Sequence, residues 1–287
     1  MRRDATHADA RLARWLVAPA LLVVTGVALV PAAATAWEAL HRHDLRLPWL
    51  GTPFVGLANF AEALGDPRFA AALARTMLFA AVSVPIELAC GLALALVMHH
   101  LVRGRAIARV GALLPWAIPT VVAALAWRFF FETSDPGGVG WLTRPVAAWV
   151  PIVAADVWKT TPFVAVLLLA GLQTIDPALY DAARVDGASP ARQLVTITLP
   201  LLAPALVVAA AFRTLDALRL FDLPYVMTAG GPGTATEPLS LYAFVALMQR
   251  LRVGYGSALS ICVFLLALGV AMAAVRALGR AAPGGHA

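Results

Sequence analysis

Six long apolar stretches alternate with short polar segments along this chain of 287 residues. A helix needs about 20 mostly apolar residues to cross the hydrocarbon core of a bilayer. Prolines inside several stretches are compatible with this, because neighbouring helices satisfy the backbone carbonyls that a proline frees. The pattern therefore predicts an all-α membrane protein with six transmembrane helices and both termini on one side. The stretches fall near Trp15–Trp37, Ala72–Met98, Val110–Phe131, Ile152–Leu172, Leu201–Leu223 and Ser257–Leu278.

The same pattern predicts how the chain is organised. A short tail precedes the first transmembrane helix, which is followed by an external segment. Five further transmembrane helices form a core that is interrupted by one long polar segment, and a second short tail follows. The predicted parts are residues 1–14 (tail), 15–71 (first helix and external segment), 72–278 (core, with the polar segment at 173–199) and 279–287 (tail).

Two shorter patterns add local detail. Apolar residues recur at helical spacing over Leu239–Gln249, which predicts an external helix before the last transmembrane stretch. Near the N-terminus, Ala34-Thr35-Ala36 follows an apolar run and a basic start. An alternative interpretation of that region is therefore a secretory signal cleaved near Ala36.

Composition and charge agree with a multi-pass membrane protein. Hydrophobic residues make up 61% and charged residues 13% of the chain, whereas about a quarter of the residues in soluble domains are charged. With both termini inside, eleven arginines fall on the inner side against six outside, so we expect cytoplasmic termini and a cytoplasmic polar segment. The basic balance then suits lipid headgroups, and no basic stripe predicts nucleic-acid binding. The inner set is Arg2, Arg3, Arg11, Arg14, Arg103, Arg105, Arg109, Arg184, Arg192, Arg276 and Arg280.

The polar segment has the pattern of two short helices separated by a glycine. Asp176 can cap a helix that begins at Pro177, where a proline is harmless because its missing N–H would be unpaired anyway. Gly187 stands where a glycine ends such a helix, and Ser189-Pro190 repeats the capping signal. The segment therefore predicts a compact helix that presents small alanine side chains, next to which another protein can approach closely.

The order Asp181-Ala182-Ala183, three residues, Gly187 and then Leu199-Pro200 resembles the EAA loop of binding-protein-dependent ABC importer permeases. The usual first residue of that motif is glutamate, so the carboxylate of Asp181 is one methylene shorter. The resemblance implies that the loop contacts a separate ATPase. The residues implicated in this coupling are Asp181, Ala182, Ala183, Asp186, Gly187 and Ala188.

Other segments resemble the carbohydrate branch of that family, the maltose, trehalose and glycerol-3-phosphate permeases. These segments are Phe212–Asp216, Phe221-Asp222 and Trp158–Phe163, and with Leu92–His99 they look most similar to trehalose/maltose permeases of high-GC bacteria. The resemblance covers Phe54–Leu278 and implies a type I ABC importer permease fold with alternating access. It also implies import of a sugar such as the disaccharides trehalose or maltose. The implied partners are a second homologous permease subunit, two ATP-binding subunits and an external substrate-binding protein.

The chain lacks the means to use ATP itself. A phosphate-binding loop needs the pattern G-x-x-x-x-G-K-[ST], but Lys159 is the single lysine of the chain and no glycine run precedes it. We therefore expect no cofactor in this chain, ATP bound by the partner ATPase subunits, and no enzymatic activity. The histidines of His41-Arg42-His43 and His99-His100 lack further ligands at metal spacing, so no metal site is expected.

Ionisable residues inside the fourth and fifth stretches are the candidate transport chemistry. Charges at membrane depth are costly and normally face a bundle interior or a water-filled cavity. The run from Arg213 to Asp222 alternates in sign every three residues, so along a continuous helix each side chain can reach the next. Two interpretations stay open, a self-paired ladder that stabilises the helix and the lining of a sugar pathway. The candidate pathway residues are Lys159, Thr160, Arg213, Asp216 and Arg219.

Two other functions stay open at this point. An ABC permease for a non-sugar or phosphorylated solute, such as glycerol-3-phosphate, is possible because Arg213 and Arg219 can attract phosphate. A remote alternative is a membrane-embedded enzyme that acts on a lipid-linked substrate. Such an enzyme needs a convergent acid–base or metal constellation at a membrane interface, and the sequence shows none.

Overall fold

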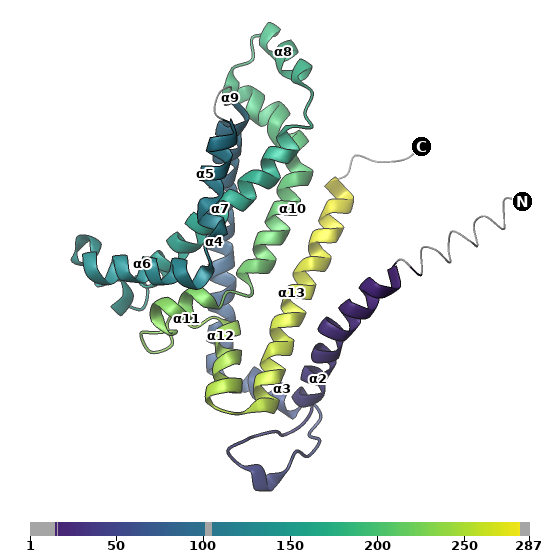
Figure 1. Ribbon diagram of the computed structural model, residues 1–287, viewed down its shortest axis with the longest axis vertical. Helices are drawn as coiled ribbons and strands as arrows, with labels where there is room; N and C mark the ends of the chain where they lie inside the picture. The colour runs from purple at the N-terminus through teal and green to yellow at the C-terminus, as the bar shows by residue number, and fades with distance from the viewer. Residues whose placement is uncertain (1–14, 16, 101–104, 282–287) are drawn as a thin grey trace, which may run out of the picture. The chain divides into compact units, whose positions relative to one another are not determined.

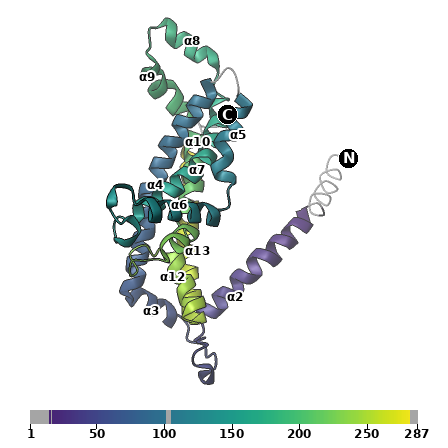
Figure 2. The ribbon, with the colours of Figure 1, turned by 60° about the vertical axis from the view of Figure 1, so that its left-hand side comes forward.

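A computed structural model describes residue 15, residues 17–100 and residues 105–281. Every element of these described ranges is helical (Figures 1 and 2), which confirms the all-α prediction. The chain divides into two compact units, which are described separately: a first unit of Met1–Asp66 with Ala243–Cys262, and a second unit of Pro67–Tyr242 with Val263–Ala287. Outside the described residues lie the tail expected at 1–14, most of the tail expected at 279–287, and Arg2, Arg3, Arg11, Arg14 and Arg103.

The second unit holds most of the long helices. Within it α4, α7 and α10 pack against one another, and a π-helical segment, Leu194–Thr198, joins α9 to α10. The helix bounds are α4 Pro67–His100, α5 Arg105–Ala117, α6 Thr120–Ser134, α7 Trp149–Leu172, α8 Pro177–Val185, α9 Pro190–Gln193, α10 Leu199–Ala217 and α11 Asp222–Thr228, with short 3-10 turns at Pro136–Gly138 and Trp141–Thr143.

Two glycines set how closely these helices approach. A Cβ atom on Gly91 of α4 would lie 2.4 Å from Cγ1 of Val164 on α7. A Cβ atom on Gly171 of α7 would lie 2.7 Å from Cδ1 of Leu202 on α10. Small residues of this kind let transmembrane helices come close enough for extensive van der Waals contact. The three helices therefore form a tightly packed scaffold around fully buried side chains such as Leu168.

The third expected span, Val110–Phe131, is present as a bent pair of helices. The structure has two helices here, α5 and α6, with a bend of 90° between their apolar parts, Val110–Ala117 and Thr120–Ser134. Figure 1 shows α6 lying across the direction of α4 and α7. The reason is Pro119, which has no N–H to donate and disfavours helical geometry at the residue before it.

The other long apolar helices lie close to their expected positions. Among the described residues, five helices are long and apolar enough to cross a membrane, and the bent α5–α6 pair makes a sixth if it counts as one span. The fifth differs most from expectation: it begins before Leu201 and stops at Ala217, not at Leu223. The five are Val17–Ala39, Pro67–His100, Trp149–Leu172, Pro190–Ala217 and Val253–Arg276.

The first unit contains an ordered segment between its helices. The buried side chain of Asn59 donates to the carbonyl oxygens of Ala39 (2.8 Å) and His41 (2.9 Å), which ties α3 to the preceding loop. A helix is present over Leu239–Gln249, as the periodicity predicts. The remaining bounds are π-helical Thr25–Leu29, α2 Val30–Ala39, a 3-10 turn at Pro48–Leu50, α3 Ala58–Gly65, α12 Leu239–Phe244, π-helical Val245–Gln249 and α13 Val253–Ala281.

Candidate functional site

The polar segment forms the helix that its capping residues predict. The carboxylate of Asp176 accepts a hydrogen bond from the backbone N–H of Ala178 (2.9 Å), and Pro177 opens α8. At the other end Gly187 has φ +75°, and the N–H of Ala188 donates to the carbonyl oxygen of Ala183 (2.9 Å). The glycine is required by this left-handed conformation rather than by crowding, because a Cβ atom there would meet nothing within 4 Å.

The six residues with the EAA-loop spacing lie on and just after α8. Asp181 and Ala182 are exposed, as are Asp186 and Gly187, whereas Ala183 and Ala188 are half-buried. The Asp181 carboxylate forms an ion pair with Arg184 one turn along α8, and both side chains are largely exposed. Figure 1 shows α8 at the end of the second unit, beyond the ends of α7 and α10. The helix therefore presents an accessible face that carries one carboxylate and a small side chain.

Side-chain hydrogen bonds connect α8 to the start of the fifth span. The hydroxyl groups of Tyr180 and Thr198 lie 3.0 Å apart, and the amide Nε2 of Gln193 donates to the carbonyl oxygen of Ala188 (2.9 Å). Ser189 caps the next helix by accepting from the N–H of Arg192 (3.4 Å). These contacts attach α8 to the π-helical segment that continues directly into α10. A displacement of α8 therefore acts on α10.

A buried ionic cluster joins the three scaffold helices. The guanidinium of Arg213 on α10 donates to both carboxylate oxygens of Glu87 on α4, at 2.5 and 3.0 Å, and to Oδ2 of Asp156 on α7 at 3.1 Å. Its Nη1 also donates to Asp216 at 2.5 Å. Glu87 is 0% exposed and Arg213 is 2% exposed. Buried charges are tolerated only when they are paired and hydrogen-bonded, and this arrangement meets both conditions.

One cavity brings most of the candidate pathway residues together. It has a volume of about 110 Å³, and its walls come from α6, α7 and the junction of α10 with α11. Lys159, Thr160, Asp216 and Arg219 all line it, whereas the buried Arg213 does not and contacts Asp216 from behind. The remaining lining residues are Thr120, Asp156, Ala217, Leu220, Phe221, Asp222 and Leu223.

The hydrogen bonds of Lys159 connect it to the broken third span. Its Nζ donates to the carbonyl oxygen of Ile118 at 2.7 Å and to that of Trp116 at 3.2 Å. The hydroxyl of Thr160 donates to the backbone of Asp156 one turn earlier on α7 (2.7 Å). Because the Thr160 hydroxyl uses its proton in this bond, its oxygen can still accept a hydrogen bond from a molecule in the cavity.

The charged run from Arg213 to Asp222 does not lie on one continuous helix. α10 ends at Ala217, and the N–H of Arg219 bonds back to the carbonyl of Asp216 (3.0 Å), so Arg219 lies beyond the helix and Asp222 opens α11. Within residues 17–100 and 105–281, Arg213–Asp216 is the single ion pair formed along this run. Asp216 and Arg219 therefore do not share the face of one helix, although both side chains line the same cavity.

Glu87 was missed by the sequence analysis, although a signal for it exists. It is the one carboxylate of the second apolar stretch, and ionisable residues at such positions mark functional or paired sites. Thr120 was also missed, because its position depends on the bend before α6. Neither side chain can be assigned a partner from sequence, since the nearest partner of Glu87 lies 126 positions away.

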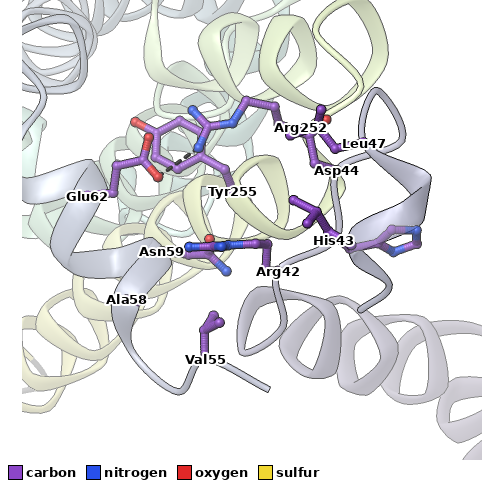
Figure 3. A pocket seen from close by; sticks show the side chains of 11 residues that line it. Arg42, His43, Asp44, Leu47, Val55, Ala58, Asn59, Glu62, Arg252 and Tyr255 are labelled. Atoms are coloured by element: carbon purple, nitrogen blue, oxygen red, sulfur yellow. Dashed lines mark hydrogen bonds and ion pairs between the residues drawn. The ribbon is translucent and has the colours of Figure 1, made fainter. Parts of the chain in front are cut away.

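A second pocket lies in the first unit and has a volume of about 260 Å³ (Figure 3). Two ion pairs involve its walls: the lining residues Arg252 and Glu62 pair at 2.7 Å, and the lining residue Asp44 pairs with the neighbouring Arg46 at 2.5 Å. The Arg46 guanidinium holds the pKa of the Asp44 carboxyl at about 2, well below its usual value. We interpret these pairs as a brace for the loop. In the ranges that the structure describes, no group of three or more histidine, cysteine, aspartate or glutamate side chains is arranged to bind a metal ion.

Together the fold and these sites define a polytopic membrane protein with a polar cavity among its helices and an exposed helix attached to that bundle. The family model "binding-protein-dependent transport system inner membrane component" matches residues 87–281, and the chain belongs to this family. It is therefore a component of a membrane transport system and not a membrane-embedded enzyme.

Relatives and solved structures agree with this assignment. The trehalose/maltose transport system permease protein MalF of Thermococcus litoralis is 42% identical over 91% of this chain and 92% of its own length. The trehalose transport system permease protein SugA of Mycobacterium tuberculosis is 41% identical over 99% of this chain and 94% of its own length. A crystal structure of a bacterial ABC transporter that imports alginate has a chain matching with a TM-score of 0.81, at 21% identity over 99% of this chain and 100% of that one. The expected fold of a type I ABC importer permease is thereby confirmed.

Proposed function

We propose that this chain is the permease subunit of an ATP-driven ABC sugar importer and forms half of its translocation pathway. The observation that carries the proposal is the similarity, at 41–42% identity over nearly full length, to two permeases named for trehalose or for trehalose and maltose. A disaccharide is the substrate class that this similarity supports. The cavity is chemically suited to a polyol, because Asp216 offers acceptors, Arg219 offers donors and Thr160 offers hydroxyl lone pairs.

A phosphorylated solute fits the cavity less well. The relatives named for sn-glycerol-3-phosphate, from Agrobacterium fabrum and Brucella suis, are 30% and 31% identical. Three carboxylates, Asp156, Asp216 and Asp222, line the cavity beside the cations Lys159 and Arg219. An anionic substrate would have to overcome repulsion from these carboxylates, whereas a neutral sugar would not.

The partners and the orientation follow from the same proposal. The polar segment around α8 faces the cytoplasm together with both termini, and a separate ATPase subunit binds there, one of two in the complex. A second, homologous permease subunit supplies the other half of the pathway, and an external substrate-binding protein delivers the sugar. The residues proposed to contact the ATPase are Asp181, Ala182, Ala183, Asp186, Gly187 and Ala188. Those proposed to line the pathway are Lys159, Thr160, Asp216 and Arg219, and the buried Arg213 supports Asp216 from behind.

Substitution of Asp181 tests the docking part of this proposal. Asp181→Lys reverses the charge on the exposed face of α8 and should reduce recovery of the ATPase with the permease, or uncouple ATP hydrolysis from transport. Asp181→Glu restores the residue usual in the family and should leave both unchanged. The matched control is Arg128→Glu, a charge reversal in an exposed pair on α6, far from α8 along the chain. Parental assembly and transport in Asp181→Lys would show that α8 is not the dock.

Trehalose uptake tests the substrate part. The permease is co-expressed with its partner subunits, reconstituted in liposomes with the binding protein outside, and supplied with ATP inside. Trehalose or maltose should raise ATP hydrolysis and accumulate, while sn-glycerol-3-phosphate should do neither. Stimulation by the phosphate ester alone would replace the sugar assignment by the phosphorylated one.

A further inference from the structure

The break in the third span leaves backbone carbonyls without helical partners. α5 ends at Ala117 and α6 begins at Thr120, and Pro119 between them has no N–H. The last carbonyls of any helix lack intrahelical donors. In a membrane an unsatisfied carbonyl is strongly unfavourable, because no water is present to donate to it. Something must therefore satisfy the end of α5 for the 90° bend to persist.

The ammonium group of Lys159 supplies that partner. Its Nζ lies 2.7 Å from the carbonyl oxygen of Ile118 and 3.2 Å from that of Trp116. A positive charge at the C-terminal end of a helix is also favourable, because the carbonyls there carry the negative end of the helix dipole. The stacking of Trp116 on Phe163, with ring centroids 5.9 Å apart, holds α5 against α7 beside this contact.

The same ammonium belongs to the wall of the cavity. Lys159 lines it together with Thr120, the first residue of α6, so the position of Thr120 depends directly on the bend. An ammonium has three N–H donors, and among the described residues it uses two, both on the broken span. One donor is left for an occupant of the cavity.

We propose that Lys159 is a positioning residue that holds the α5–α6 bend from the cavity side, and that a polyol in the cavity binds the third N–H of the same ammonium. Substrate occupancy and the angle of the bend are then coupled through one side chain. The identity of the occupant rests on the proposed function, but the mechanical role of Lys159 does not. Arg219, the other cation that lines the cavity, provides a matched comparison because no hydrogen bond from its side chain to the broken span is found in the described ranges.

The angle of the bend can be measured in the assembled transporter. Cys90 and Cys262 are first replaced by alanine, and spin labels are then attached to cysteines at Val110 on α5 and Phe129 on α6, which are 64% and 67% exposed. Pulsed electron–electron double resonance gives the distance distribution between the labels in lipid nanodiscs, with and without trehalose and the binding protein. The variants are Lys159→Met, which keeps the length but removes the donors, Lys159→Arg, which keeps donors and charge, and Arg219→Met.

The expected result is a narrow distribution in the parental complex that shifts when trehalose is added. Lys159→Met should broaden or displace the sugar-free distribution and abolish the shift, whereas Lys159→Arg and Arg219→Met should keep the sugar-free distribution. The positioning role of Lys159 is overturned if Lys159→Met gives the same sugar-free distance distribution as the parental complex. It is also overturned if Arg219→Met broadens that distribution as much as Lys159→Met does. A shift that persists in Lys159→Met overturns the coupling.

Failure of the variant to assemble and failure of the parental complex to transport trehalose are also informative. If Lys159→Met does not assemble, Lys159→Gln replaces it, because a glutamine amide is one bond too short to restore both hydrogen bonds; a parental distribution in that variant counts against the proposal in the same way. If the parental complex does not transport trehalose, the proposed substrate is wrong, while the sugar-free distributions still decide the role of Lys159.

Discussion

Both carboxylate oxygens of Glu87 accept hydrogen bonds from the guanidinium of Arg213, at 2.5 Å from Nε and 3.0 Å from Nη2, although the residues lie 126 positions apart. This planar, two-bond geometry is the one in which arginine binds carboxylates most strongly. It fixes α4 to α10 at the depth of the cavity. Arg213 can therefore present Asp216 to the cavity while its own charge stays buried.

Removal of Glu87 should destabilise the permease severely. Glu87→Leu leaves the guanidinium of Arg213 buried without its two-bond partner, and breaking a buried ion pair in this way costs about 3–5 kcal/mol. We expect a strongly lowered Tm and yield of the purified complex. Glu132→Leu serves as the control, because Glu132 pairs with Arg128 in an exposed position and such pairs contribute at most about 1 kcal/mol. Equal Tm values for the two variants would contradict the structural role of the cluster.

Asp216→Ala should impair transport while leaving assembly intact. The Asp216 side chain is 58% exposed at the cavity, and Arg213 keeps Glu87 and Asp156 when it is removed. A lost hydrogen bond to a charged group corresponds to about a tenfold or larger rise in KM for the sugar. The measurement is uptake kinetics beside complex yield, for Asp216→Ala, Arg219→Met and the double variant.

The double variant separates the two interpretations of this charged run. Since Asp216 and Arg219 form no ion pair in the described structure, Arg219→Met should not rescue Asp216→Ala in either yield or uptake. A low yield in Asp216→Ala that recovers in the double variant would support the self-paired ladder and refute the pathway assignment.

Gly187→Ala should loosen α8 without a steric clash. A non-glycine residue in the left-handed conformation costs roughly 1–2 kcal/mol, while asparagine tolerates it better. Amide hydrogen exchange across Pro177–Val185 should accelerate in Gly187→Ala and less in Gly187→Asn. Gly269→Ala in α13 is the control, because that glycine is helical and a Cβ atom there meets nothing within 4 Å. Unchanged exchange in Gly187→Ala would show that α8 does not depend on its glycine end.

What the sequence predicted well was local. The caps at Asp176 and Ser189 and the left-handed Gly187 depend on neighbours within a few residues. Helix positions followed from runs of apolar residues, since a helix needs about 20 such residues to cross a bilayer. The resemblance to the EAA loop was equally local, because that motif occupies one contiguous segment.

What the sequence did not predict depends on contacts between distant helices. To predict the bend after α5, one must know that Lys159 satisfies the freed carbonyls, although it lies 41 positions beyond Ile118. Without that partner, a proline in an apolar run is equally compatible with a kinked continuous span. The end of α10 at Ala217 likewise has no glycine or proline signal, so the charges after it were assigned to one helix. Both errors concern the cavity, where the helices depart from regular geometry.

The proposed orientation can be tested with two of the most exposed side chains in the second unit. Val146 lies between α6 and α7 and is 84% exposed, and Val185 ends α8 and is 89% exposed. With the N-terminus inside and the bent α5–α6 pair counted as one span, three spans before Val146 place it outside, and four spans before Val185 place it in the cytoplasm. In a background without Cys90 and Cys262, Val146→Cys in intact cells should react with a membrane-impermeant maleimide. Val185→Cys should react only after permeabilisation, and labelling in detergent confirms that both thiols are accessible. The reverse labelling pattern would show that the topology is inverted and that α8 is not accessible to a cytoplasmic ATPase. This comparison therefore also tests the proposed coupling.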